Sequence, residues 1–322
     1  PLLDEDHILG FDEIEVSQKD AKCQLAEKWF EKTVTDSELQ VSEDDTQIHI
    51  KGREFAYTID RRTALFTEMK FAGREYLNHP MELNIWRAPT DNDMYIKSEW
   101  KKAHYDKAYT RAYTTEVVQG KHGVKITSHA SVVAETVQKI LDVMITWKIE
   151  AAGKIDADIA VTKDDEFPDL PRFGVRMFLD KKLSAVRYFG MGPQESYCDK
   201  HQAASHGLYQ ANVDDLHEDY IRPQENGSHY DCEHVELNNS RYGIVVSAEN
   251  AFSFNASYYT QEELEKKTHN YELTESDSVV FCVDYALNGI GSNSCGPVVL
   301  DQYRFDDVLF RFQFTLIPYV KG

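Results

Sequence analysis

The sequence predicts an all-β fold, a large antiparallel β-sandwich, because apolar and polar residues alternate in many segments and helical periodicity is scarce. In 154–163 (KIDADIAVTK), every second residue of 155–161 is apolar, and 173–179 and 310–316 repeat this pattern. Successive side chains of a strand point to opposite faces, so each of these segments would bury one face of a sheet.

Further strands are expected wherever the alternation recurs between turn residues. These segments are 47–52, 55–60, 64–71, 123–133, 136–150, 185–190, 242–249, 252–259 and 278–286. Helices are expected at 97–107, 201–206 and 261–267, and all three are short. The chain lacks the strand–helix repetition of a barrel that alternates the two, so packed sheets are the architecture that fits.

Residues 1–44 depart from this pattern. Residues 1–17 hold one isolated strand-like run (HILGFDEIEVS), and a single strand has no partner for its hydrogen bonds or its apolar face. Residues 18–44 are charged and do not alternate. We therefore expect 1–17 to be the last strand of a preceding domain, 18–44 to be a linker, and 45–322 to be the sandwich.

The composition argues against two broad classes of function. The 322 residues carry a formal net charge of −20, which repels phosphate backbones and anionic lipid, so we expect no nucleic-acid partner and no membrane partner. The five cysteines are scattered without C-x-x-C spacing, and no signal peptide is visible at the start. These features predict a cytoplasmic protein with reduced thiols.

Three loop-like stretches mix aromatic, charged and amide side chains: 84–93 (NIWRAPTDND), 188–200 (YFGMGPQESYCDK) and 220–227 (YIRPQENG). Such groups could bind polyols and stack on sugar rings. The same residues are also common in turns for backbone reasons, so a purely structural role stays open.

Glycoside hydrolysis needs two carboxyl groups on opposite sides of the bond that is cleaved. Glu195 and Glu225 are the pair that the loops offer, but the sequence cannot place them facing each other. In 229–236 (HYDCEHVE) the candidate metal ligands fall on both faces of one strand, which favours a partly solvated strand over a metal site. We therefore assign no catalytic residue and no metal ligand to this chain.

The segment 289–297 (GIGSNSCGP) places a thiol, Cys295, among glycines, a proline and small polar residues. A tight turn needs glycine and proline but not cysteine. The thiol is either a small apolar plug in the turn or part of a binding surface.

The stretches NIWRAPTDND, LPRFGVRMFL, YFGMGPQESYCDK, YIRPQENG and NGIGSNSCGP occur here in the order and spacing of one known domain. From about residue 45 to 322 the chain resembles the C-terminal domain of family 2 β-galactosidases of the lactose-operon type, which is also the small chain of two-subunit enzymes. The resemblance implies a sandwich similar to galactose mutarotase. It also implies that 1–17 closes an immunoglobulin-like domain.

The resemblance further implies how this domain serves a hydrolase of terminal β-D-galactosides such as lactose. The catalytic glutamates lie on a separate barrel domain, and the present domain forms a wall of the active site. Its partners are the remaining domains or a large subunit, the galactoside, and further copies in an oligomer. No cofactor is expected in this chain, whereas Mg and Na are expected on other domains of the complete enzyme.

The resemblance also suggests site residues. Residues 294–297 (Ser-Cys-Gly-Pro) stand where some members carry Ser-Trp-Ser-Pro with a sugar-contacting tryptophan, so Cys295, Ser294 and Asn293 are the expected substrate-binding residues. A cysteine side chain has no aromatic face on which a sugar could stack. It is also much smaller than tryptophan, so it leaves more room there. Ser98 and Glu99 are further candidates on a loop that we expect to be mobile. The stretches 84–100 and 289–297 should share one end of the sandwich.

Two other functions remain open. A free-standing aldose epimerase of the mutarotase type would need a general acid and a general base, usually His and Glu, and the twelve histidines here give no recognisable pair. A non-catalytic carbohydrate-binding module would use the same loops without chemistry. Galactose binding and a mutarotation assay separate these alternatives.

Overall fold

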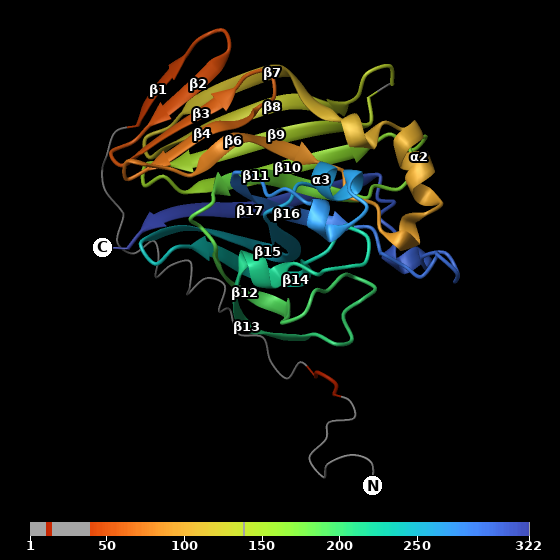
Figure 1. Ribbon diagram of the computed structural model, residues 1–322. Helices are drawn as coiled ribbons and strands as arrows, with labels where there is room; N and C mark the ends of the chain where they lie inside the picture. Colours follow the sequence, from red (N-terminus) through yellow and green to blue (C-terminus); the bar gives the residue numbers. More distant parts are fainter. Residues whose placement is uncertain (1–10, 15–38, 138, 322) are drawn as a thin grey trace.

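The computed structural model describes residues 11–14, 39–137 and 139–321, and its architecture is the predicted all-β, antiparallel one (Figure 1). A five-stranded sheet has the order β1-β2-β3-β4-β5. Its strands are β1 (Gln40–Glu43), β2 (Gln47–Lys51), β3 (Phe55–Asp60), β4 (Leu65–Phe71) and β5 (Arg74–Glu75).

A larger sheet of twelve strands has the order β13-β12-β14-β15-β17-β10-β9-β8-β7, and it continues from β15 through β16 and β11 to β6. Its strands are β6 (Leu77–Asn84), β7 (Tyr109–Gln119), β8 (Gly123–Val133), β9 (Leu141–Glu150), β10 (Ile155–Lys163), β11 (Arg172–Asp180), β12 (Ala185–Gly192), β13 (Ser205–Asn212), β14 (Ser228–Asn238), β15 (Tyr242–Ser257), β16 (Ser278–Leu287) and β17 (Leu309–Val320).

Strand β15 joins the two layers of the sandwich. Its first part, 242–247, pairs with β17, whereas 253–257 pairs with β16. One strand therefore runs from one layer into the other, and the large sheet folds over on itself. This closure makes the sandwich resemble a barrel.

The core lies between the layers. The ring of Phe66 on β4 packs 4.9 Å from that of Trp147 on β9, and the Trp147 indole donates a hydrogen bond of 2.8 Å to Ala64 O. Further along, the rings of Phe173 on β11 and Phe310 on β17 are 5.0 Å apart. The alternating apolar residues of β10 and β17 are all buried, as predicted from their spacing.

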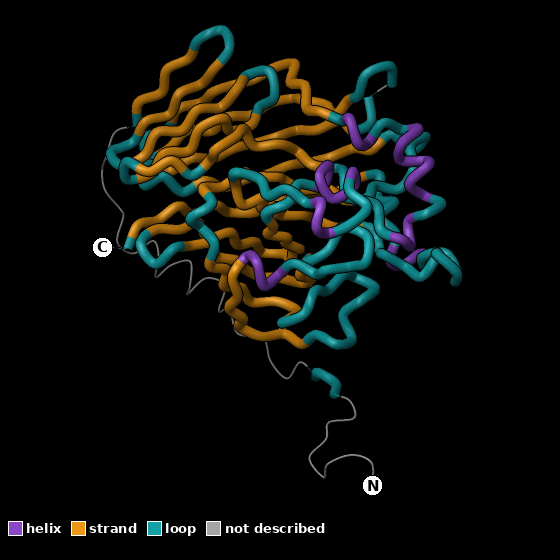
Figure 2. The backbone as a smooth tube through the Cα atoms, viewed as in Figure 1, coloured by secondary structure: helices purple, strands orange, loops and turns teal. Residues whose placement is uncertain are grey.

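Helices are short, and most of them, including α2, lie with the long loops at one end of the sandwich, whereas one 3₁₀ turn lies apart from them near β12 (Figures 1 and 2). They are α2 (Ile96–Lys102), α3 (Gln261–Lys266) and the 3₁₀ turns η1 (Asp91–Asp93), η2 (Tyr105–Lys107), η3 (Val213–Leu216), η4 (Asn270–Glu272) and η5 (Asp301–Tyr303). Thr260 caps α3, because its hydroxyl accepts a 3.1 Å hydrogen bond from Glu263 N. The helix expected at 201–206 is wrong: these residues form a turn and the start of β13.

The sheet begins earlier than expected. Strand β1 lies within the stretch 18–44 that the sequence suggested as a linker, and it pairs with β2. The remainder of that linker and most of the expected strand in 1–17 lie outside the described residues, so the division of 1–44 stays a prediction. Of that strand, 11–14 is described as irregular, with Glu13 accepting a 2.8 Å hydrogen bond from His206 N.

Candidate functional site

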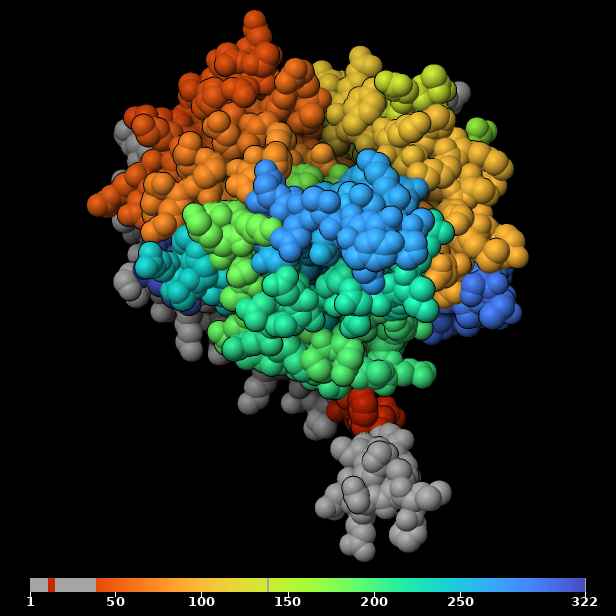
Figure 3. Space-filling view, viewed as in Figure 1, coloured from red at the N-terminus to blue at the C-terminus, as the bar shows by residue number. Residues whose placement is uncertain are grey.

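Four loops meet around a cavity of about 550 Å³ at the loop-rich end, called the rim cavity below. In Figures 1 and 3 the segment near α2 and the blue segment that precedes β17 lie side by side there. The loops that line the cavity contribute Thr90, Asn92, Tyr197, Asp199, Lys200, Tyr220, Gln224, Glu225, Ile290, Gly291, Ser292, Pro297, Val298, Val299, Leu300 and Tyr303.

A buried arginine ties the loop after β6 to the loop after β16. Arg87 pairs with Asp93 through Nη2–Oδ1 and Nε–Oδ2 contacts of 2.7 and 3.1 Å, and its side chain is 0% exposed. Its guanidinium also donates to the carbonyl oxygens of Asn288 and Gly289. The fixed fork of an arginine can make all of these bonds at once. These bonds place 84–93 and the base of 289–297 at the same end of the sandwich, as expected for 84–100 and 289–297.

A second buried arginine holds the loop that carries Glu225. Arg172 donates from Nη1 to Glu225 Oε1 at 2.6 Å, and its Nε and Nη2 donate to the two carboxylate oxygens of Asp284. The other Glu225 oxygen accepts the backbone N–H of Ala88 at 3.1 Å. Both carboxylates are almost completely buried. Arg172 and the backbone of Ala88 therefore hold the Glu225 carboxylate in place.

Glu195 is engaged in the same way. One carboxylate oxygen accepts from Lys200 and from the hydroxyl of Tyr220, and the other accepts from Gly227 N at 2.8 Å and from Tyr197 at 3.3 Å. Burial and the bond to Glu195 raise the pKa of Tyr220. Glu195 accepts four hydrogen bonds and Glu225 accepts two, and all of these donors belong to the framework of the loops.

Residues 289–297 form what we call the rim loop. Asp199 anchors its start, because its two oxygens accept the N–H groups of Ile290 and Gly291 at 3.0 and 2.7 Å. The side chain of Asn92 donates to Gly291 O. Gly291 has φ +56°, a conformation that suits glycine. The base of the loop is thus fixed.

The tip of the rim loop carries the residues expected to bind substrate. Ser294 and Cys295 are exposed and Asn293 is half-buried, and none of the three lines the rim cavity. Their neighbours Ser292 and Pro297 do line it. The tip therefore projects from the mouth of the cavity toward solvent.

Ser98 and Glu99 lie on α2 rather than on a loop, and both are exposed. The Ser98 hydroxyl donates to Tyr95 O, and Glu99 accepts from Lys102 at 2.8 Å. Neither residue lines the rim cavity. Buried Trp100 anchors this helix, and its indole donates to Asp169 O.

The described residues hold no group of three or more His, Cys, Asp or Glu side chains placed to bind a metal ion. In 229–236 a bulge interrupts the strand, so the side chains do not simply alternate. Among the helices that the structure describes, none is long and apolar enough to cross a membrane.

Sequence reasoning missed the two arginine centres. Arg87 and Arg172 sit in motifs that the sequence singled out. Asp93 lies in the same motif as Arg87, but the carbonyl groups that Arg87 binds and the carboxylates that Arg172 binds come from distant segments, as with Asp284, 112 residues beyond Arg172. One feature of the sequence could have indicated a buried arginine. In LPRFGV, a charged residue lies in a strand with apolar residues on both sides of it.

The comparisons with known proteins agree with these motifs. A family model described as the beta galactosidase small chain matches residues 51–316. The chain is 43% identical over 98% of its length to a beta-galactosidase of Actinobacillus pleuropneumoniae, and 32% identical over 96% to one of Staphylococcus xylosus. It spans 30% of the length of each of these relatives.

Among solved structures, a galactose 1-epimerase of Lactobacillus acidophilus aligns with 89% of this chain and 99% of its own, at 8% identity and a TM-score of 0.47. The two structures are too different for this similarity to support any conclusion about the present chain. The fold is defined by the pairing of its strands. The family model and the sequence identities are sufficient by themselves: the chain belongs to the β-galactosidase small-chain family.

Proposed function

We propose that the chain is the C-terminal portion of a β-galactosidase that hydrolyses terminal β-D-galactosides such as lactose. The observation that carries this proposal is the 43% identity to a protein named beta-galactosidase, of which the chain spans 30%. The chain would complete one wall of the active site, while the remaining domains or a large subunit supply the catalytic acid and nucleophile.

The state of the two loop glutamates supports this division of labour. A retaining or inverting glycosidase needs carboxyl groups free to donate a proton or attack the sugar. Glu225 is held by Arg172 and a backbone N–H, and Glu195 by four donors. Both groups stabilise loops and leave the chemistry to another part of the protein.

In this proposal the tip of the rim loop contacts the galactoside. Asn293, Ser294 and Cys295 extend from a firmly anchored base, so they can reach a neighbouring domain's site without disturbing the sandwich. The small thiol leaves space for a large aglycone. Ser98 and Glu99 would join the same wall from α2.

The other expectations follow from the same assignment. We propose that Mg²⁺ or Na⁺, where the complete enzyme uses them, is held by its other domains, and that the complete enzyme is an oligomer. A cytoplasmic location fits the free thiols at all four described cysteines (Cys198, Cys232, Cys282 and Cys295), which suit a reducing compartment.

Hydrolysis of an aryl β-galactoside tests the proposal. The chain alone should show no activity above background, and adding the remaining part of the protein should restore it. Hydrolysis by the chain alone that Glu195→Gln or Glu225→Gln abolishes would overturn the proposal. Accelerated mutarotation of galactose by the chain, followed by polarimetry, would support the epimerase alternative instead.

A further inference from the structure

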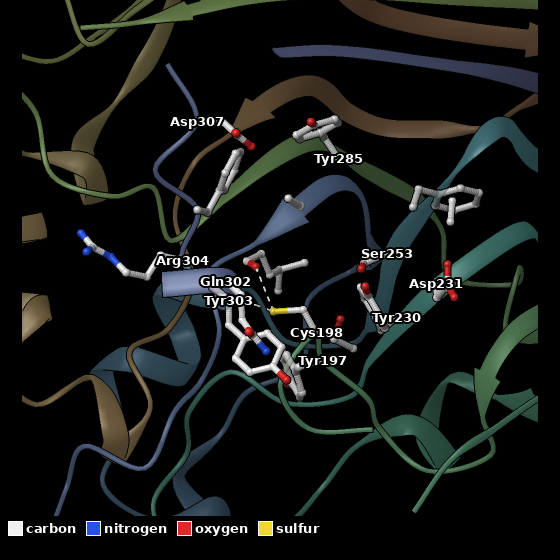
Figure 4. Close-up of a pocket in the computed structure, with 16 residues that line it drawn as sticks. Tyr197, Cys198, Tyr230, Asp231, Ser253, Tyr285, Gln302, Tyr303, Arg304 and Asp307 are labelled. Carbon is white, nitrogen blue, oxygen red and sulfur yellow. Dashed lines mark hydrogen bonds between the residues drawn. The ribbon is translucent and has the colours of Figure 1, made fainter. Parts of the chain in front are cut away.

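A second cavity of about 310 Å³, called the tyrosine cavity below, adjoins the rim cavity and shares Tyr197 and Tyr303 with it. This volume lies at the lower end of the range of about 300–1,000 Å³ that is typical of ligand pockets. Its walls come from β14, β15, β16 and the segment 302–307 (Figure 4).

A bulge in β14 brings two side chains to this cavity. The register of β14 and β15 shifts between His229 and Cys232, so Tyr230 and Asp231 together face the single residue Ser253. Asp231 has φ +54°, which few residues other than glycine adopt. Bulges redirect side chains and are frequent beside binding sites. All three facing residues line the cavity.

A second bulge lies in β16. Strand β11 pairs Phe173 with Ala286 and Gly174 with Asp284, which leaves Tyr285 as the extra residue. Tyr285 also lines the cavity, and Figure 4 shows it near Asp307, away from the group of Tyr230, Asp231 and Ser253. Two independent irregularities in adjacent parts of the sheet therefore place tyrosines around one space.

The cavity holds hydrogen-bonding groups that the fold does not use. Ser228 is 1% exposed and lines the cavity, but its hydroxyl has no hydrogen-bond partner among the described residues. A buried hydroxyl without a partner is costly, so a ligand hydroxyl there would satisfy it. Burial and the nearby Asp231 raise the pKa of Tyr230, and burial and the nearby Asp307 raise the pKa of Tyr285. Both phenols therefore remain protonated and can donate hydrogen bonds.

The charges around the cavity disfavour an anion. Asp307 lines it, and so does Asp231, which contacts the ring of His206 at 2.8 Å. The cation at its edge, Arg304, is paired with Asp169 through an Nε–Oδ2 contact of 2.8 Å. Burial beside Asp199 raises the pKa of the Cys198 thiol to about 12, so this thiol is no nucleophile at neutral pH. The cavity therefore suits binding of a neutral molecule, and its thiol cannot act as a nucleophile toward that molecule.

We propose that the tyrosine cavity is a saccharide-binding site, separate from the rim loop, that takes one neutral pyranose unit of a galactoside. Tyrosine rings pack on the C–H face of a pyranose, while hydroxyl, amide and carboxylate groups bind its hydroxyls. The inference rests on the proposed function only for the choice of galactosides as probes.

Isothermal titration of the full chain with galactose and lactose tests this proposal. Saturable binding in the millimolar range is expected. Tyr230→Ala and Asp307→Asn should each weaken it about tenfold. Tyr285→Phe keeps the ring in its packing and should weaken binding less. The matched control is Tyr113→Ala, because Tyr113 is an exposed tyrosine on β7, and this variant should bind as the parent chain does.

Thermal unfolding of each variant identifies any that fail to fold. Asp307 is exposed, so Asp307→Asn should fold as the parent chain does and still tests binding if Tyr230→Ala does not fold. Absence of sugar binding would overturn the proposal. So would binding that Cys295→Ala abolishes and Tyr230→Ala leaves intact, or binding of choline in place of sugar. Because the assay measures binding and not hydrolysis, it can succeed or fail independently of the restored β-galactosidase activity.

Discussion

Arg172, at the start of β11, and Cys295, in the rim loop, both lie in motifs that the sequence singled out, yet their surroundings are opposite. Arg172 is fully buried and bonded to two carboxylates from distant strands and loops, whereas Cys295 is exposed at the tip of the rim loop. A buried ion pair fixes geometry because losing either partner leaves an uncompensated charge. An exposed tip can change without that cost. Stability should therefore depend on the base of the loops, and substrate affinity on the tip.

The largest expected effect is on Arg172. Arg172→Met leaves Asp284 and Glu225 buried without their cation, so the free energy of unfolding should fall by about 3–5 kcal/mol. Urea unfolding measures this change. Arg311→Met is the matched control, because Arg311 pairs with Asp158 on the surface, so its loss should lower the free energy of unfolding far less. An equal fall in the free energy of unfolding in the two variants would contradict the conclusion that the buried ion pairs of Arg172 matter more for stability than a surface pair.

His229 should make this end of the molecule sensitive to acid. Burial lowers its pKa to about 4, and its ring packs against Tyr188 and Phe254. The unfolded chain therefore binds the proton first, so this group reduces stability as the pH falls from about 6.5 to about 4, by up to about 3 kcal/mol.

The variant His229→Phe keeps an aromatic ring and removes the titration. Unfolding measured at several pH values should show a shallower loss of stability for the variant than for the parent chain in that window. Parallel curves would mean that other groups cause the acid sensitivity.

The smallest effect on stability is expected at Cys295. Cys295→Ala should change the free energy of unfolding by less than about 0.5 kcal/mol, because the side chain is exposed. In the assembled enzyme it should nevertheless alter the KM for galactosides. Cys282→Ala is the comparison, since Cys282 is buried and its loss should destabilise the chain without affecting KM. An unchanged KM in Cys295→Ala would remove the tip from the substrate site.

Much of the fold was predictable because most central strands bury one face. Strands such as β10 and β17 alternate strictly, and their apolar residues are buried as expected. The strands that the alternation missed include β7 and β13, which lie at the two ends of the long strand order. Their residues are mostly exposed or half-buried on both faces, so their sequences carry little alternation.

The site was predictable only in part. The resemblance implied that 84–100 and 289–297 share one end of the sandwich, and the bonds from Arg87 join 84–93 to the base of the rim loop. The partners of Arg172 could not be predicted, because ion pairing over such separations depends on the folded register of β11 and β16. Nor does alternation reveal the two bulges, since each breaks the very period from which strands are recognised.

The position of β17 has a consequence for the order in which the chain can fold. This strand, close to the C-terminal end of the described residues, lies between β15 and β10 in the interior of the large sheet. Until β17 has been synthesised and docked, its two neighbours each expose an unpaired edge, and such edges invite association with other chains. The sheet therefore cannot be completed progressively as residues leave the ribosome. Slow, late folding that depends on these distant pairings is expected.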